Sequence, residues 1–192
     1  MSPKLRVFVI SLVIVLPLDQ ATKQWIVEKI HYADRIEIIP GLFDLTHVRN
    51  AGGAFSFFAD GPHEQRMVFF IGTTLIAIVL LLVFYRNLES EEVLPATALG
   101  VVLGGALGNL TDRLRYGEVV DFLDVHLWGG YTWPTFNVAD SAIVIGVTLL
   151  VLEIFLNREK EEGNQDGNTD PSGPSDTPDS SSDSPAAANS TL

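Results

Sequence analysis

Two aspartates lie at the ends of apolar segments in a chain that is otherwise rich in hydrophobic residues. Asp121 lies in the stretch 117–122, and Asp140 comes immediately before an apolar run that ends at Leu156. A carboxylate at membrane depth is costly, so each marks a candidate functional position. Two carboxyl groups that meet can share one proton and activate a water molecule. We therefore begin from the hypothesis of an aspartyl hydrolase embedded in a membrane.

This chemistry needs one ionised aspartate to deprotonate water and one protonated aspartate to donate to the carbonyl oxygen or the leaving amine. The chain contains no cysteine, which excludes thiolate catalysis, disulfides and cysteine-based metal sites. No Ser/His arrangement is evident, and the four histidines lack the spacing of metal ligands such as HExxH. The sequence therefore implies no metal and no organic cofactor.

Each polar position also has a simpler explanation. Asp140 could cap the helix that follows it, because the helix dipole stabilises a carboxylate at the N-terminus. Asp121 could be a solvated residue of an interfacial helix, and Asp124 competes with it for the same helical face. The segment 50–53, Asn-Ala-Gly-Gly, could be a hairpin turn. No single motif decides between structure and chemistry.

Three apolar segments have the length of membrane-spanning helices. They cover residues 67–85, 93–110 and 138–156. At about 1.5 Å per residue, each reaches roughly 27–28 Å, close to the hydrocarbon thickness of a bilayer. In the segment 93–110, small residues recur every four positions at 96, 100, 104 and 108, which lets another helix approach closely.

The first apolar segment is shorter and begins after two basic residues. Residues 7–18 follow Lys4 and Arg6, a pattern that also describes a secretory signal peptide. No small-residue cleavage site follows, so we favour a retained helix over about 5–27. Such a helix places Asp19 and Lys23 within the membrane, four residues apart on one face, where they can pair.

The region between the first two helices, about 30–60, predicts a small sheet on the outer membrane face. Residues 36–39 and 43–48 alternate in polarity and are separated by Pro40-Gly41. Residues 111–135 are expected to add an interfacial helix. The predicted fold class is thus an α-helical membrane protein with four transmembrane helices, a small extracytoplasmic β-sheet and an interfacial helix, all within a domain spanning 1–156.

The negative charge of the chain is concentrated at its C-terminal end. Residues 157–192 hold eight acidic and two basic residues, a net −6 that is half of the total −12. Because this segment has few large apolar residues, it predicts a disordered cytoplasmic tail. Nothing in the charge pattern indicates nucleic acid. Lys4 and Arg6 favour a cytoplasmic N-terminus, and four crossings return the C-terminus to the same side.

Taken together, the polar motifs closely resemble those of lipoprotein signal peptidase, also called signal peptidase II. They follow the order of that family and cover residues from about 5 to 156 of this chain. The matching segments are Asp19-Gln20 with Thr22-Lys23, Asn50-Ala51-Gly52-Gly53-Ala54-Phe55, Gly108-Asn109-Leu110-Thr111-Asp112-Arg113, Gly117-Glu118-Val119-Val120-Asp121-Phe122, and Phe136-Asn137-Val138-Ala139-Asp140.

The resemblance implies a multi-pass enzyme of the bacterial cytoplasmic (inner) membrane whose active site lies near the extracytoplasmic face. It would remove signal peptides from prolipoproteins that carry diacylglycerol on a cysteine, cutting before that cysteine. The catalytic pair of the family falls on Asp121 and Asp140. Its supporting residues fall on Asp19, Lys23, Asn50, Asn109, Arg113 and Asn137. Lipid-modified prolipoproteins and membrane lipids would be its partners, and we expect a monomer.

Two other classes of function remain open at this point. A small ion-coupled transporter could use Asp19, Lys23 and Asp140 as a proton path. It predicts discontinuous helices or an internal repeat; the first helix is short, but no matching second half is evident. A non-catalytic membrane assembly factor could be built on the small-residue stripe. Neither explains the two edge aspartates flanked by Asn109, Arg113 and Asn137.

Overall fold

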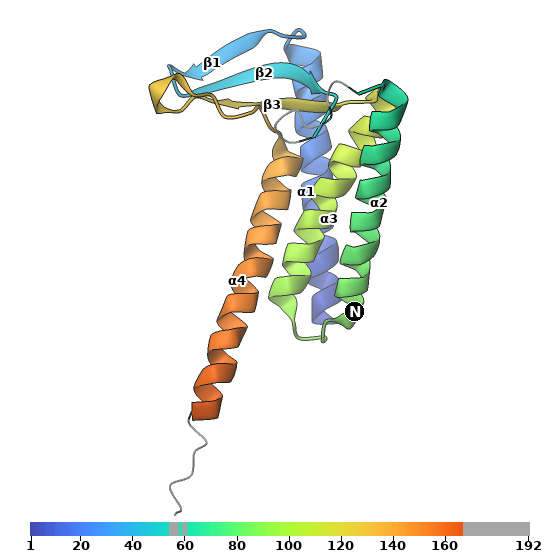
Figure 1. The fold of residues 1–192 in the computed structure, drawn as a ribbon, viewed down its shortest axis with the longest axis vertical. Helices are drawn as coiled ribbons and strands as arrows, with labels where there is room; N and C mark the ends of the chain where they lie inside the picture. Colours follow the sequence, from blue (N-terminus) through green and yellow to red (C-terminus); the bar gives the residue numbers. More distant parts are fainter. Residues whose placement is uncertain (54–57, 59–60, 167–192) are drawn as a thin grey trace, which may run out of the picture. The chain divides into compact units, whose positions relative to one another are not determined.

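The computed structural model describes residues 1–53, 58 and 61–166 of the chain. Four helices and a three-stranded sheet make up this part (Figure 1). The elements in chain order are α1 (Pro3–Lys29), β1 (Arg35–Ile39), β2 (Phe43–Asn50), α2 (His63–Asn87), α3 (Val93–Tyr116), β3 (Val119–Val125), the 3₁₀ turn η2 (Trp128–Gly130) and α4 (Val138–Asp166).

All four helices are long and apolar enough to cross a membrane. The candidate spans are Pro3–Lys29, His63–Asn87, Val93–Tyr116 and Val138–Leu156. The predicted architecture of four transmembrane helices with a small sheet is confirmed. α1 runs through Asp19 and Lys23, so both charged residues belong to a span, as the sequence indicates.

The chain divides into two units, Met1–Asn157 and Arg158–Leu192, and the candidate site lies within the first. Helix α4 continues past Leu156 to Asp166, into the segment predicted as a disordered tail. Glu, Lys and Arg are good helix formers, which accounts for this continuation. The rest of the predicted tail, 167–192, lies outside the described residues.

The interfacial helix predicted for residues 111–135 is wrong. α3 extends to Tyr116 and ends at Gly117, whose φ of 75° is the left-handed conformation that terminates helices. The chain then forms β3, because β-branched and aromatic residues dominate 119–125 and favour a pleated strand. The only helical turn after it in this segment is η2, of three residues.

The sheet is antiparallel in the order β1-β2-β3 and lies across one end of the helices (Figure 1). In the β2–β3 ladder Asp44 pairs with Asp124, and Val48 pairs with Asp121. The register shifts between Leu45 and Val48, where β2 contains one residue more than β3. Because of this bulge, the pairing of β2 residues with β3 residues is offset by one on one side of the bulge relative to the other.

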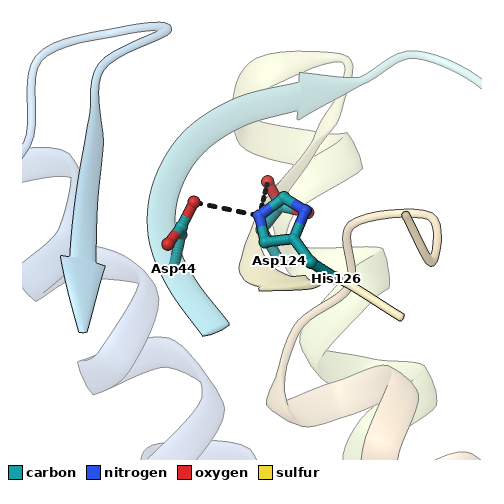
Figure 2. A group of neighbouring side chains, drawn as sticks. All are labelled: Asp44, Asp124 and His126. Atoms are coloured by element: carbon teal, nitrogen blue, oxygen red, sulfur yellow. Dashed lines mark hydrogen bonds and ion pairs between the residues drawn. The ribbon is translucent and has the colours of Figure 1, made fainter. Parts of the chain in front are cut away.

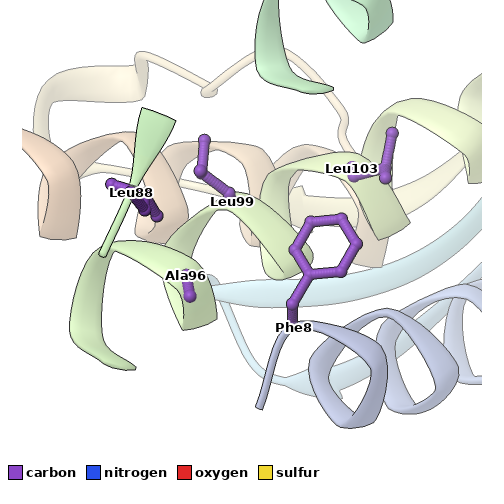
Figure 3. Close-up of a cluster of buried hydrophobic side chains, with 5 residues drawn as sticks. All are labelled: Phe8, Leu88, Ala96, Leu99 and Leu103. Carbon is purple, nitrogen blue, oxygen red and sulfur yellow. The ribbon is translucent and has the colours of Figure 1, made fainter. Parts of the chain in front are cut away.

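Helix α3 is the buried centre of the bundle. One cluster of apolar side chains joins it to α1 and to the α2–α3 connection: Phe8, Leu88, Ala96, Leu99 and Leu103 (Figure 3). The close approach depends on the predicted small-residue stripe. A Cβ placed on Gly100 would lie 2.5 Å from the carbonyl oxygen of Phe8. The stripe therefore brings α1 against α3, and this contact aligns the polar residues at the sheet end.

Candidate active site

Asp121 lies in the middle of β3 and is almost fully buried, at 2% exposure. Both of its carboxylate oxygens accept hydrogen bonds from asparagine side chains. Asn137 Nδ2 donates to Oδ1 at 2.7 Å, and Asn50 Nδ2 donates to Oδ2 at 3.0 Å. Asn50 is the last residue of β2, which pairs with β3, and its side chain therefore reaches Asp121.

Asp140 lies in the first turn of α4, where it forms a capping box with Asn137. The Asn137 side-chain oxygen accepts from the Asp140 backbone N–H at 2.9 Å, and Asp140 Oδ2 accepts from the Asn137 backbone N–H at 3.2 Å. The capping explanation offered by the sequence is therefore correct for Asp140. It does not exclude chemistry, because Asp140 Oδ1 is held separately by Asn109 Nδ2 at 2.8 Å.

Asn137 links the two aspartates through one side chain. Its amide nitrogen donates to Asp121, while its amide oxygen holds the backbone of Asp140. The same nitrogen lies 3.3 Å from Asn109 Oδ1 and 3.3 Å from the Val120 carbonyl oxygen. With 0% exposure, Asn137 is a buried connection between β3, α3 and α4. Residues distant in sequence are thus combined into one polar network.

A buried ion-pair group lies behind this network. Lys23 Nζ is 3.0 Å from Asp19 Oδ2, 3.0 Å from Asp112 Oδ2 and 2.9 Å from Asn109 Oδ1. Asp19 Oδ1 also accepts from the Ala139 backbone N–H at 2.9 Å. The predicted pairing of Asp19 with Lys23 is therefore present. It ties α1 to α3, which carries Asn109, and to the first turn of α4, which carries Asp140.

Two residues that the prediction did not assign to the site belong to this group. Asp112 Oδ2 accepts from the Val120 backbone N–H at 3.1 Å, directly beside Asp121. Gln20 Nε2 donates to Asp112 Oδ1 at 3.1 Å. The available signal was spacing, because Asp112 follows Asn109 by three residues and Gln20 precedes Lys23 by three, which places each pair on one helical face.

Arg113 lies at the edge of the site. Its Nη2 donates to the Gly52 carbonyl oxygen at 3.2 Å, and its guanidinium lies 4.9 Å from the Phe70 ring centre. The Gly52 backbone N–H in turn donates to Asn50 Oδ1 at 3.0 Å. Segment 50–53 is therefore a turn that also orients Asn50. The last two positions of that motif, Ala54 and Phe55, lie outside the described residues.

Asp121 and Asp140 line one pocket of about 1010 Å³. Asn50, Asn109 and Arg113 contribute to its polar side. Its apolar lining includes Val144 and Ile145, which lie on the membrane-spanning part of α4 and are 65% and 56% exposed. The pocket thus joins two carboxyl groups to a surface suited to lipid.

Burial, together with the nearby charge of Asp140, raises the pKa of the Asp121 carboxyl to about 7. The hydrogen bonds from Asn50 and Asn137 oppose this shift without cancelling it. At neutral pH, Asp121 can therefore keep its proton beside a carboxylate. That is the electrostatic arrangement of a general acid next to a general base.

Asp124, the rival candidate, does not line the pocket along with Asp121. The sequence-based prediction placed both residues on one face of a helix, in which residues three apart lie on the same side. In β3 the same spacing puts them on opposite faces. Asp124 Oδ2 instead lies 2.7 Å from Arg35 Nη2.

The comparisons with known proteins agree with one another. The family described as signal peptidase (SPase) II matches residues 11–156. The lipoprotein signal peptidase of Syntrophotalea carbinolica is 49% identical over 77% of this chain and 89% of its own length. That of Geobacter metallireducens is 42% identical over 84% and 98%. A solved structure titled as a bacterial membrane enzyme is 32% identical, with a TM-score of 0.71 over 80% of this chain and 90% of its own.

The ion-pair group generates a prediction about stability. Replacing Lys23 with Met leaves Asp19 and Asp112 as buried charges without their shared cation. We expect a loss of about 3–5 kcal/mol in unfolding free energy. Lys29→Met, at an exposed lysine in the last turn of α1, should change it by less than about 0.5 kcal/mol. Denaturant titration in detergent measures both, and equal losses would contradict the role given to Lys23.

Proposed function

Because the chain belongs to the signal peptidase II family, we propose that it cleaves lipoprotein signal peptides with Asp121 and Asp140 as its two catalytic groups. The family and its relatives establish a bacterial membrane protease that acts on lipoproteins. The transporter alternative is not supported. The observation that carries the aspartic mechanism is that both carboxyl groups line a single pocket and are joined through Asn137.

In the proposed mechanism, Asp140 is the base and Asp121 is the acid. Asp140 removes a proton from a water molecule, whose oxygen then attacks the carbonyl carbon of the scissile peptide bond. Asp121 donates its proton to the carbonyl oxygen, which gives a neutral tetrahedral diol. Asp140 next protonates the leaving nitrogen while Asp121 recovers the proton from the diol. The peptide C–N bond breaks, and both aspartates return to their starting states.

The supporting residues fix this pair rather than react. Asn50 and Asn137 hold the two oxygens of Asp121, and Asn109 holds Asp140. Lys23 orients Asn109, because its ammonium group donates to the Asn109 side-chain oxygen. Arg113 fixes the turn that carries Asn50 and lines the pocket. Preorganisation of this kind lowers the cost of reaching the reactive geometry.

We propose that the substrate is a prolipoprotein carrying diacylglycerol on a cysteine and that cleavage occurs before that cysteine. The exposed apolar wall of the pocket on α4 supports this, since acyl chains there would stay in contact with membrane lipids. Basic Lys4 and Arg6 favour a cytoplasmic N-terminus, with the site near the extracytoplasmic face. Both carboxyl groups come from one chain, so a monomer would be sufficient.

The aspartic mechanism predicts that neither carboxyl group can be replaced. Asp121→Asn and Asp140→Asn keep the side-chain shape but remove the titrating group, so each should lower kcat by at least about a hundredfold. Asp34→Asn, at an exposed position away from the pocket, should retain wild-type turnover. Cleavage of a lipidated prolipoprotein by purified, folded variants is the measurement. Substantial turnover by either dyad variant would exclude the mechanism.

The raised pKa of Asp121 predicts how the rate depends on pH. The acid must be protonated, and this form is lost as pH rises through about 7. Well above that value, kcat/KM should fall about tenfold per pH unit, because both carboxyl groups become ionised. The profile should be measured in detergent at fixed ionic strength, with thermal stability checked at each pH. A rate that stays flat from pH 7 to 9 in folded enzyme would argue against Asp121 as the acid.

The apolar wall predicts a strong preference for lipidated substrate. Each buried CH₂ contributes about 0.8 kcal/mol, so a few methylenes exceed the 1.4 kcal/mol that corresponds to tenfold in affinity. We expect kcat/KM for a diacylated prolipoprotein to exceed that for its unlipidated form by more than about tenfold. Both forms should be compared in the same micelles, with Asp140→Asn protein as the blank. Equal rates would show that the acyl chains are not recognised.

A further inference from the structure

A second cluster of potential ligands lies on the sheet, outside the pocket that holds Asp121 and Asp140. Asp44 of β2, Asp124 of β3 and His126 just after β3 each offer a ligand atom, and these atoms lie within 4.8 Å of one another (Figure 2). Asp44 and Asp124 are direct partners in the ladder. Two like charges facing each other across strands are destabilising, so this pair requires a cation.

The distances in the cluster fit a small metal ion. His126 Nε2 lies 3.0 Å from Asp44 Oδ2 and 3.8 Å from Asp124 Oδ2. Ligands about 2.0–2.2 Å from a tetrahedral Zn²⁺ are separated from each other by roughly 3.3–3.6 Å. The observed separations bracket that range. One imidazole with two carboxylates is also a ligand set that Zn²⁺ accepts.

The imidazole of His126 is held in an orientation suited to a ligand. Its other nitrogen, Nδ1, lies 3.1 Å from Thr132 Oγ1. Nε2 lies 3.5 Å from Arg35 Nη1 as well as 3.0 Å from Asp44 Oδ2. When Nδ1–H donates to the Thr132 hydroxyl, Nε2 carries no proton and can bind a metal in place of Arg35. Metal-binding histidines commonly have such a partner on the second nitrogen.

The two carboxylates are also incompletely satisfied by the protein. Their side chains are 7% and 3% exposed, yet Oδ1 of Asp44 and Oδ1 of Asp124 have no hydrogen-bond partner among the described residues. A buried carboxylate oxygen without a partner is costly. Each unpaired oxygen shares its carboxyl group with an Oδ2 that faces His126, so a metal ion bound through Oδ2 would neutralise the carboxyl group whose Oδ1 lacks a partner.

Arg35 of β1 supplies the cation in this structure. Its guanidinium nitrogens lie 3.3 Å from Asp44 Oδ2 and 2.7 Å from Asp124 Oδ2. The side chain is 53% exposed and approaches from the edge strand, so it can leave without disturbing the core. One positive charge offsets only half of two carboxylates, whereas a divalent ion offsets both.

We propose that Asp44, Asp124 and His126 form a structural zinc site from which Arg35 is displaceable. A bound Zn²⁺ joins β2, β3 and the segment after β3, which carries the chain on to Asn137 and Asp140. Its effect is on the stability of the sheet end, and none of its ligands lines the catalytic pocket. The sequence spacing could not reveal this site, since Asp44 and Asp124 meet only through the strand register.

The test measures zinc bound to the purified full chain in detergent micelles after removal of metals with a chelator. Equilibrium dialysis against Zn²⁺ gives the stoichiometry and Kd, and thermal unfolding gives the change in Tm. We expect one saturable equivalent and a Tm that rises with Zn²⁺. Arg35→Ala should bind at least about tenfold more tightly, because the competing cation is gone. A purely structural ion-pair network would instead lose stability without gaining affinity for metal.

Two ligand variants and one control locate the bound ion. His126→Ala and the isosteric Asp44→Asn should each weaken Zn²⁺ binding by at least about tenfold and abolish the rise in Tm. His31→Ala, at an exposed histidine elsewhere, should bind like the unchanged chain. The proposal is overturned if neither the unchanged chain nor Arg35→Ala binds Zn²⁺ saturably. It is also overturned if removal of Arg35 does not increase affinity, or if folded His126→Ala binds as well as His31→Ala.

Discussion

Lys23 is a buried cation in a membrane-spanning helix, and neutralising it determines much of the arrangement around the site. A charge at this depth is tolerated only with partners. Those partners come from separate elements: Asp19 from α1, and Asp112 and Asn109 from α3. Once they converge, Asp112 holds the backbone of β3 beside Asp121, and Asn109 holds Asp140. The need to neutralise Lys23 therefore also helps to fix the positions of Asp121 and Asp140.

The N-terminus of α4 combines structure and chemistry in the same atoms. Asn137 and Asp140 satisfy each other's backbone N–H groups, which any helix start needs. The remaining polar atoms of both side chains point into the network that contains Asp121 and Asn109. Capping therefore fixes the rotamer of the proposed catalytic carboxyl group of Asp140 at no additional cost in side-chain entropy. An aspartate and an asparagine at these two positions explain both the helix start and the site.

Local pattern in the sequence was sufficient for the helices and for the family to which the chain belongs. Apolar length located the spans, and the four-residue spacing identified both the Asp19–Lys23 pair and the small-residue face of α3. The prediction of an interfacial helix failed because 119–125 forms a strand only with β2 beside it as a partner. Asp112 was passed over for a related reason, since its value lies in a contact with the Val120 backbone that only the folded chain creates. The positions of Asp121 and Asp140 relative to each other likewise depend on how β3, α3 and α4 pack. Hydrophobic periodicity describes each of these elements separately and gives no information about their packing.

The bulge in β2 makes the length of that strand a condition for the whole site. Asp121 and Asp124 use opposite faces of β3, one toward the pocket and one toward Arg35. Their partners Val48 and Asp44 match them only because β2 inserts one residue between Leu45 and Val48. Loss of a single residue there would shift the ladder by one and exchange inward for outward side chains beyond it. Asn50 would then turn away from Asp121. The segment 45–48 is consequently a place where residue count matters more than residue identity.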